Sequence, residues 1–352
     1  MSYSQRRERL RALLAERSLD ALLITSPSNR YYLSGFELHD VQFNESSGCL
    51  VITRSGRDFL LTDSRYTEAA SKFWPEDDIV IYRRDRARVV SDTLGRCGSR
   101  IGFETASVQA DFADELRSLR CLEPCNGLVE KLRVHKDAEE VAALKKSFAL
   151  NHAMLEWVHS VIREGMTEAE LSWQIERYFR EHGASELAFP SIVAFGGNAA
   201  LPHAVPSDLA LAEDTGILLD VGCRLDSYCS DQTRSFWFGE HPDELFVETR
   251  MLVAEAQETV IRHMEPGAPL SEVAQRANDI FAKAGVEDRF IHGLGHGVGL
   301  DTHEAPSFSC RAQGFLEPGM TVTVEPGLYY PGRLGIRLEV TVLVEENGVT
   351  VL

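Results

Sequence analysis

Alternating apolar and polar residues predict two β-hairpins in the second half of the chain. In the first, residues 218–234, an apolar strand leads into a polar turn and a second strand alternates small and polar residues. We centre the turn between Leu225 and Asp226. Asp220 and Asp231 are then equidistant from the turn and face each other, with Cβ atoms about 5 Å apart. Their like charges repel, and a bound cation would remove the repulsion.

The second predicted hairpin spans residues 321–342 and turns at Pro331-Gly332. Glu325 and Glu339 are equidistant from Gly332, so they too are expected to face each other. One face takes Val322, Val324, Ile336, Leu338 and Val340, and the other takes Thr323, Glu325, Arg337, Glu339 and Thr341. For one hairpin alone, a solvated surface ribbon explains the carboxylates equally well. Two hairpins with facing carboxylates indicate a metal site much more strongly.

Between the hairpins, residues 292–304 contain three histidines separated by four glycines. Glycine lets the backbone approach a crowded centre closely, so this segment is a candidate for a further ligand. The alternative is a flexible glycine-rich loop with exposed histidines.

Asp220, Asp231, His296, Glu325 and Glu339 resemble, in order and spacing, the five metal ligands of the pita-bread metallopeptidases. This superfamily includes aminopeptidase P, prolidase and methionine aminopeptidase. The Xaa-Pro peptidase branch is matched by Ser230-Asp231-x-Thr233-Arg234, Gly295-His296-Gly297-x-Gly299, Val324-Glu325-Pro326-Gly327 and Gly335-Ile336-Arg337-x-Glu339. The resemblance implies an α/β creatinase-like N-terminal domain and an α+β pita-bread catalytic domain. We place them at residues 1–125 and 126–352.

The hydrophobic pattern of the N-terminal part alternates strands with helices, as in an α/β domain. We expect strands at 21–25, 48–53, 58–61, 79–82 and 100–103, and helices at 4–16, 64–73, 88–95 and 108–119. Expected helices of the catalytic part are 129–134, 137–162, 167–182, 243–264 and 269–284. Thr167 and Glu170 form a predicted capping box, and Trp157 and Trp173 are expected in the core.

Composition narrows the class of protein further. The 352 residues carry a net charge of −18, which opposes binding to nucleic acid or to an anionic membrane. No apolar run is long enough to span a bilayer and the first residues do not resemble a signal peptide, so a cytoplasmic location is expected. The seven cysteines are irregularly spaced, which favours reduced thiols.

Four carboxylates and one imidazole are a hard, oxygen-rich donor set. They favour Mn²⁺, which we expect first, and also Co²⁺ or Fe²⁺, while Zn²⁺ stays open. Four negative charges exceed what one divalent ion neutralises, so two ions are expected. By resemblance, Asp231 and Glu339 bridge both ions, Asp220 holds one, and His296 with Glu325 holds the other.

The resemblance implies hydrolysis of Xaa-Pro bonds by a hydroxide that bridges the two ions. The substrates would be proline-containing dipeptides or short peptides, cleaved by a dipeptidase or an aminopeptidase that forms a homodimer. Glu325 would be the proton shuttle. His303 and His203 would orient the substrate carbonyl, and His292 would line the leaving-group side. Arg337 would either order the carboxylates or bind a substrate carboxylate.

Three alternative interpretations of the function remain. A methionine aminopeptidase is disfavoured by the long N-terminal domain and by the motif around Arg337. A creatinase-type hydrolase without metal is disfavoured because all five ligands are present. A catalytically silent peptide-binding module is disfavoured for the same reason. Val340 stands where an acidic residue is common in the family, which leaves the metal affinity open.

Overall fold

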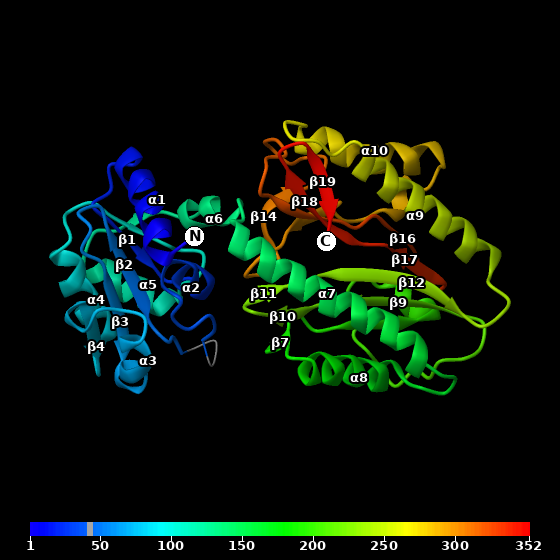
Figure 1. Cartoon of the computed structure of the whole chain (residues 1–352), viewed down its shortest axis with the longest axis horizontal. Coiled ribbons are helices and arrows are strands. Elements are labelled where there is room, and N and C mark those ends of the chain that lie inside the picture. The colour runs from blue at the N-terminus through cyan, green and yellow to red at the C-terminus, as the bar shows by residue number, and fades with distance from the viewer. Residues whose placement is uncertain (41–44) are drawn as a thin grey trace. The chain divides into compact units, whose positions relative to one another are not determined.

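The computed structural model describes residues 1–40 and 45–352, which form two compact units, 1–133 and 134–352 (Figure 1). The division follows Arg133 because helix α6 (Leu128–Arg133) packs on α1 (Tyr3–Glu16) and α2 (Pro27–Ser34) of the first unit. The domain limits 1–125 and 126–352 stay a prediction.

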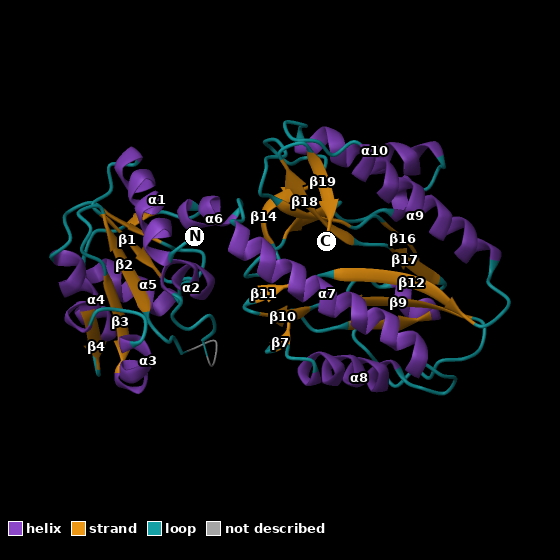
Figure 2. Cartoon of the chain, viewed as in Figure 1, coloured by secondary structure: helices purple, strands orange, loops and turns teal. Residues whose placement is uncertain are grey.

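The first unit is built on a mixed sheet with strand order β4-β3-β2-β1-β5-β6. Its strands are β1 (Ala21–Ile24), β2 (Cys49–Thr53), β3 (Phe59–Asp63), β4 (Ile79–Tyr82), β5 (Ile101–Phe103) and β6 (Glu123–Pro124). Its other helices are α3 (Thr67–Ser71), α4 (Arg86–Gly95) and α5 (Ala110–Leu119). Strand β1 is buried along its whole length because α4 and α5 cover one face of the sheet and α1 and α2 pack on the other (Figure 2). The predicted α/β architecture is confirmed here.

The second unit contains two pairs of helices, each packed on its own set of strands (Figure 1). The first pair is α7 (Ala138–Val161) and α8 (Glu168–Glu181), with β7 (Glu186–Leu187), β8 (Ile192–Phe195), β9 (Thr215–Val221), β10 (Cys223–Leu225), β11 (Tyr228–Cys229) and β12 (Gln232–Phe238). The second pair is α9 (Glu244–Arg262) and α10 (Leu270–Lys283), with β13 (Gly295–Gly297), β14 (Glu304–Phe308), β15 (Thr321–Val324), β16 (Gly327–Tyr330), β17 (Leu334–Arg337), β18 (Val340–Glu345) and β19 (Gly348–Val351). The apolar core divides in the same way, with one cluster beneath each pair. The expected order, a helix pair and then a hairpin, therefore occurs twice.

The register predicted for the first hairpin is wrong by one residue on each strand. Leu225 pairs with Tyr228, so the turn is centred between Asp226 and Ser227, whose φ angles are 49° and 72°. A two-residue hairpin turn of this kind needs positive φ at both central positions, which aspartate tolerates better than leucine does. Asp220 consequently pairs with Thr233, and Asp231 becomes its diagonal neighbour.

The register predicted for the second hairpin is confirmed. Val324 pairs with Val340 and Gly327 pairs with Arg337, which places Glu325 opposite Glu339. The strands are interrupted at this point, because Pro326 has no N–H with which to continue the ladder. The N–H of Glu325 donates instead to the carbonyl of Leu294, at 2.9 Å.

The prediction that Trp173 lies in the core is wrong, since 64% of its surface is exposed. The buried stripe of α8 runs through Leu171, Ile175 and Phe179, so Trp173 falls on the opposite side of the helix. Trp157 is partly buried against the core beneath α7 and α8. Among the described residues, the helices are all too short or too polar to cross a membrane.

Candidate functional site

The nine site residues predicted from the sequence line one cavity in the second unit, with a volume of about 900 Å³. These residues are Asp220, Asp231, His296, Glu325, Glu339, His203, His292, His303 and Arg337. The wall also includes apolar side chains, among them Phe189, Ile192, Leu201, Val205 and Ile291. The cavity therefore combines a cluster of ionisable groups with an apolar surface.

The carboxylates of the two hairpins meet because their backbones are joined. Strand β12 lies beside the interruption between β17 and β18, where the N–H of Glu339 donates to the carbonyl of Thr233, at 3.1 Å. Two residues further along β12, the hydroxyl of Ser235 donates to the carbonyl of Arg337 and accepts from its N–H. These contacts tie the first helix pair and its strands to the second.

Potential ligand atoms form three overlapping groups, within each of which the atoms lie no more than 4.8 Å apart. The groups are Asp220 with Asp231 and Glu339, His296 with Glu325 and Glu339, and Asp231 with His296 and His303. Asp231, Glu339 and His296 each belong to two groups. All five residues expected as ligands are thus close enough together to share metal ions.

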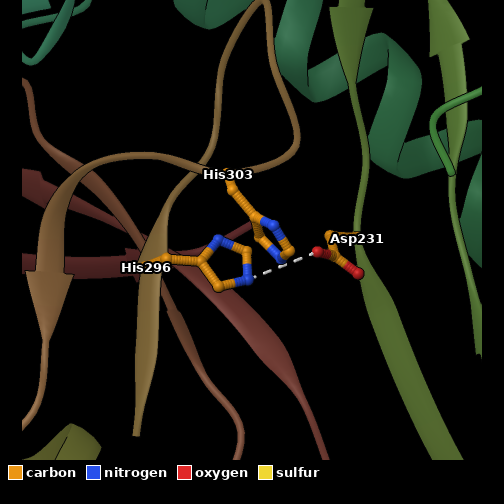
Figure 3. A group of neighbouring side chains, drawn as sticks. All are labelled: Asp231, His296 and His303. Atoms are coloured by element: carbon orange, nitrogen blue, oxygen red, sulfur yellow. Dashed lines mark ion pairs between the residues drawn. The ribbon is translucent and has the colours of Figure 1, made fainter. Parts of the chain in front are cut away.

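His296 points its Nε2 atom into this cluster (Figure 3). The Nε2 atom lies 3.3 Å from Oε1 of Glu325 and 3.7 Å from Oδ2 of Asp231. The Nδ1 atom lies 3.1 Å from the carbonyl of Gly297, which can only accept a hydrogen bond. When the imidazole is neutral, this contact leaves the lone pair on Nε2, where it can bind a metal. His303 lies edge-on to His296, with 4.1 Å between ring centroids.

Arg337 is engaged by the protein itself. Its guanidinium donates to Oδ2 of Asp220 at 2.6 Å, to the hydroxyls of Thr233 at 3.1 Å and Tyr329 at 2.8 Å, and to the carbonyl of Pro202 at 3.3 Å. The Thr233 hydroxyl donates in turn to Glu339, at 2.7 Å. Of the two roles considered for Arg337, these contacts favour ordering the carboxylates.

Sequence reasoning did not identify Tyr329 and Thr323 as parts of the site. The Tyr329 hydroxyl lies 2.9 Å from Nε2 of His292, whose Nδ1 faces the carbonyl of Gly293. Tyr329 therefore holds both His292 and Arg337. The Thr323 hydroxyl accepts from the N–H of His296 and donates to Glu325, each at 3.0 Å. The alternation of the second hairpin, which places Thr323 on the polar face, was the available signal for that residue.

The electrostatics of the cluster fit a divalent cation. Burial and the surrounding carboxylates raise the pKa of Asp231 and of Glu339 well above the usual range, and burial also raises the pKa of Asp220. Burial would raise the pKa of Glu325 too, but its hydrogen bond to His296 and the charge of that residue lower it. Oδ1 of Asp220 and Oε1 of Glu339 are buried without a hydrogen-bond partner among the described residues. Such oxygens are ligands that hard divalent ions prefer.

Two family models match the chain. Residues 142–346 match the model described as metallopeptidase family M24, and residues 6–135 match the creatinase/prolidase N-terminal domain. A Bacillus subtilis (strain 168) protein, named uncharacterized peptidase YqhT, is 34% identical over 97% of this chain and 95% of its own length.

Solved structures resemble the whole chain. The structure titled Xaa-Pro dipeptidase from Bacillus anthracis has a TM-score of 0.92 and 33% identity, covering 99% of this chain and 97% of that one. The prolidase from Pyrococcus horikoshii OT3 has a TM-score of 0.90 and 28% identity, covering 99% and 97%. The X-Pro aminopeptidase from Thermotoga maritima MSB8 has a TM-score of 0.83 and 30% identity, covering 96% of each chain.

Proposed function

Because this chain belongs to metallopeptidase family M24, we propose that it hydrolyses the peptide bond before proline, as an Xaa-Pro dipeptidase or aminopeptidase. The same matches confirm the predicted fold class, a creatinase-like α/β domain followed by an α+β pita-bread domain. One observation carries the proposal: four carboxylates and an imidazole converge in a single cavity, with two carboxylate oxygens left unpartnered. Neighbours of both substrate classes, dipeptidases and an aminopeptidase, support the specificity for proline.

The proposed centre holds two divalent ions, with Mn²⁺ expected first. By the family resemblance, Asp231 and Glu339 would hold both ions, and each belongs to two of the potential ligand groups, as His296 also does. Asp220 would complete the ligands of one ion, and His296 with Glu325 those of the other. Bound ions of this kind lower the pKa of water and stabilise negative charge on a substrate oxygen.

The protein's own groups would orient the peptide and move its protons. Glu325, held ionised by His296, would accept a proton from water and deliver it to the departing proline nitrogen. Burial and the nearby His296 lower the pKa of His303, so near neutral pH its imidazole is an uncharged donor for the substrate carbonyl. His203, which also lines the cavity, would assist, and His292, oriented by Tyr329, would line the leaving-group side.

The test compares an Xaa-Pro dipeptide, an Xaa-Pro tripeptide and matched peptides with alanine in place of proline, after reconstitution with Mn²⁺. We expect cleavage of the proline peptides only, and its loss on chelation. The dipeptide and the tripeptide separate a dipeptidase from an aminopeptidase. Cleavage of Met-Ala peptides in preference to proline peptides would favour a methionine aminopeptidase. About two bound ions per chain without cleavage of any peptide would instead identify a silent module.

His303 belongs to one potential ligand group, with Asp231 and His296, so His303→Ala tests whether its imidazole acts on the substrate or holds an ion. We expect turnover to fall by about 10²-fold or more, while the metal content of the same sample stays near that of the wild type. Loss of the metal together with the activity would contradict the proposed role of His303.

A further inference from the structure

A short loop between β13 and β14, residues 298–303, carries His303 into the cavity (Figure 3). The next residue, Glu304, has a side chain that is only 5% exposed. Its Oε1 accepts from the N–H of Asp301 at 2.9 Å. A Cβ atom added at Gly299 would lie within 2.6 Å of the same carboxylate, so the loop is packed closely around it. The position of this carboxylate therefore determines the position of the loop.

Lys136 holds the carboxylate of Glu304 from the other side. Its Nζ atom lies 3.2 Å from Oε2 of Glu304, and its side chain is 1% exposed. A charged pair so fully removed from water is costly to form and, once formed, costly to break, because removal of one partner leaves the other buried and unpaired. Neither of the two side chains lines the cavity. The pair acts on the cavity only through the chain that it holds.

Lys136 is itself held in place by its neighbours in the chain. Its N–H donates to the carbonyl of Gly319 at 2.8 Å. The following residue, Asp137, is the N-cap of α7 and forms a capping box with Glu140. Glu140 also accepts from the hydroxyl of Tyr228, at 2.9 Å, in the hairpin that leads to Asp231. The segment 136–140 is thus attached both to Gly319, just before β15, and to Tyr228 of β11.

We propose that Lys136 is a positioning residue for His303: through the buried ion pair with Glu304 it fixes the loop that presents the imidazole to the cavity. The assignment of His303 to the reaction rests on the proposed function, but the positioning itself does not. Lys136→Met keeps the length of the side chain and removes only the charge. Lys146→Met is the matched control, because Lys146 lies on α7 and forms an exposed ion pair with Asp226 at 2.7 Å.

The first experiment observes the imidazoles directly in the metal-free protein. With isotope-labelled histidine, the ring signal of His303 is assigned by its loss in His303→Ala. We expect Lys136→Met to move or broaden this signal and Lys146→Met to leave it unchanged. If Lys136→Met does not fold, Glu304→Gln removes the other charge with less change of shape and is expected to move the same signal. A His303 signal unaffected by both variants would overturn the proposal.

The second experiment combines the substitutions in the Mn²⁺-loaded enzyme. We expect Lys136→Met to lower kcat about ten- to hundred-fold, as for a misplaced group, with KM and the metal content little changed. In the His303→Ala background the same substitution should cost less than about two-fold, because the group that it positions is gone. If the loss of kcat in the double variant equals the product of the losses in the two single variants, Lys136 has a general structural role and the proposal is overturned. If the wild type cleaves no proline peptide, the proposed function fails and the histidine spectra alone decide the role of Lys136.

Discussion

Glu168, the first residue of α8, is fully buried and holds both ends of the segment that contains His203. Its carboxylate accepts from the N–H of Phe195 at 2.7 Å, from the amide of Asn198 at 3.0 and 3.1 Å, and from the N–H of Ser207 at 3.0 Å. The Ser207 hydroxyl donates to it as well. A single side chain therefore closes the loop 196–206, which forms one wall of the cavity.

The variant Glu168→Gln tests this closure with almost no change of volume. The amide nitrogen of the glutamine replaces one of the two acceptor oxygens. It is expected to face Ser207 rather than Phe195, because the Ser207 hydroxyl can rotate and accept a hydrogen bond, whereas the N–H of Phe195 can only donate. The N–H of Ser207, which is partly buried, then loses its partner, at a cost of about 1–3 kcal/mol. The remaining bonds lose their charge assistance, worth about 1 kcal/mol more. We therefore expect the free energy of unfolding to fall by about 2–4 kcal/mol.

Urea unfolding of the metal-free protein measures this loss as a shift of the midpoint at constant slope. Glu170→Gln is the control, because Glu170 lies two residues further along α8 and forms only the exposed capping box with Thr167. We expect the control to lose at most about 1 kcal/mol. If the two variants lose the same free energy, Glu168 does not close the loop and the reasoning is refuted.

Three further predictions concern pH and metal. Burial, together with the charge of Glu130, raises the pKa of Glu104 from 4.5 to about 7, so the stability it contributes is complete below pH 4.5 and is lost as the pH rises towards 7. Between pH 4.5 and 8, the free energy of unfolding of the wild type should therefore fall relative to that of Glu104→Gln, by about 3 kcal/mol. Parallel pH profiles of the two unfolding free energies would contradict this. Asp231→Asn should lose bound metal and at least about 10²-fold in turnover, and near-normal turnover would refute its role as a shared ligand. The pKa values of Asp231 and Glu339 are raised in the metal-free centre, which favours their protonated forms, so calorimetry in two buffers should detect proton release when Mn²⁺ binds, and the stabilisation by Mn²⁺ should grow as the pH rises. A binding heat independent of the buffer would exclude this displacement.

Patterns that are local in the sequence predicted much of this molecule. The Pro331-Gly332 turn set the register that brings Glu325 opposite Glu339, since residues equidistant from a turn must pair. The register predicted for the first hairpin was wrong because the turn was centred one residue too early, whereas it lies between Asp226 and Ser227. Asp220 was therefore expected to pair with Asp231, but it pairs with Thr233.

Contacts between distant segments could not be read from such patterns. Lys136 and Glu304 are 168 residues apart, and no periodicity relates them. The hydrogen bonds that Ser207 donates to Glu168 form because the loop 196–206 folds back towards the start of α8. No local sequence pattern predicts that fold of the loop. Trp173 was misplaced because it was assigned to the apolar face of its helix, whereas the buried face of α8 carries Leu171, Ile175 and Phe179.

The centre draws on both helix pairs: Asp220 and Asp231 come from the segment that follows α7 and α8, whereas His296, Glu325 and Glu339 come from the segment that follows α9 and α10. Cutting the chain between β12 and α9, at residues 239–243, would give two fragments, neither of which carries a full donor set. Hydrogen bonds between β12 and the segment from β17 to β18 would still join such fragments, and a bound metal would strengthen their reassembly. The chain therefore offers a natural place to build a split reporter whose complementation is strengthened by a divalent ion.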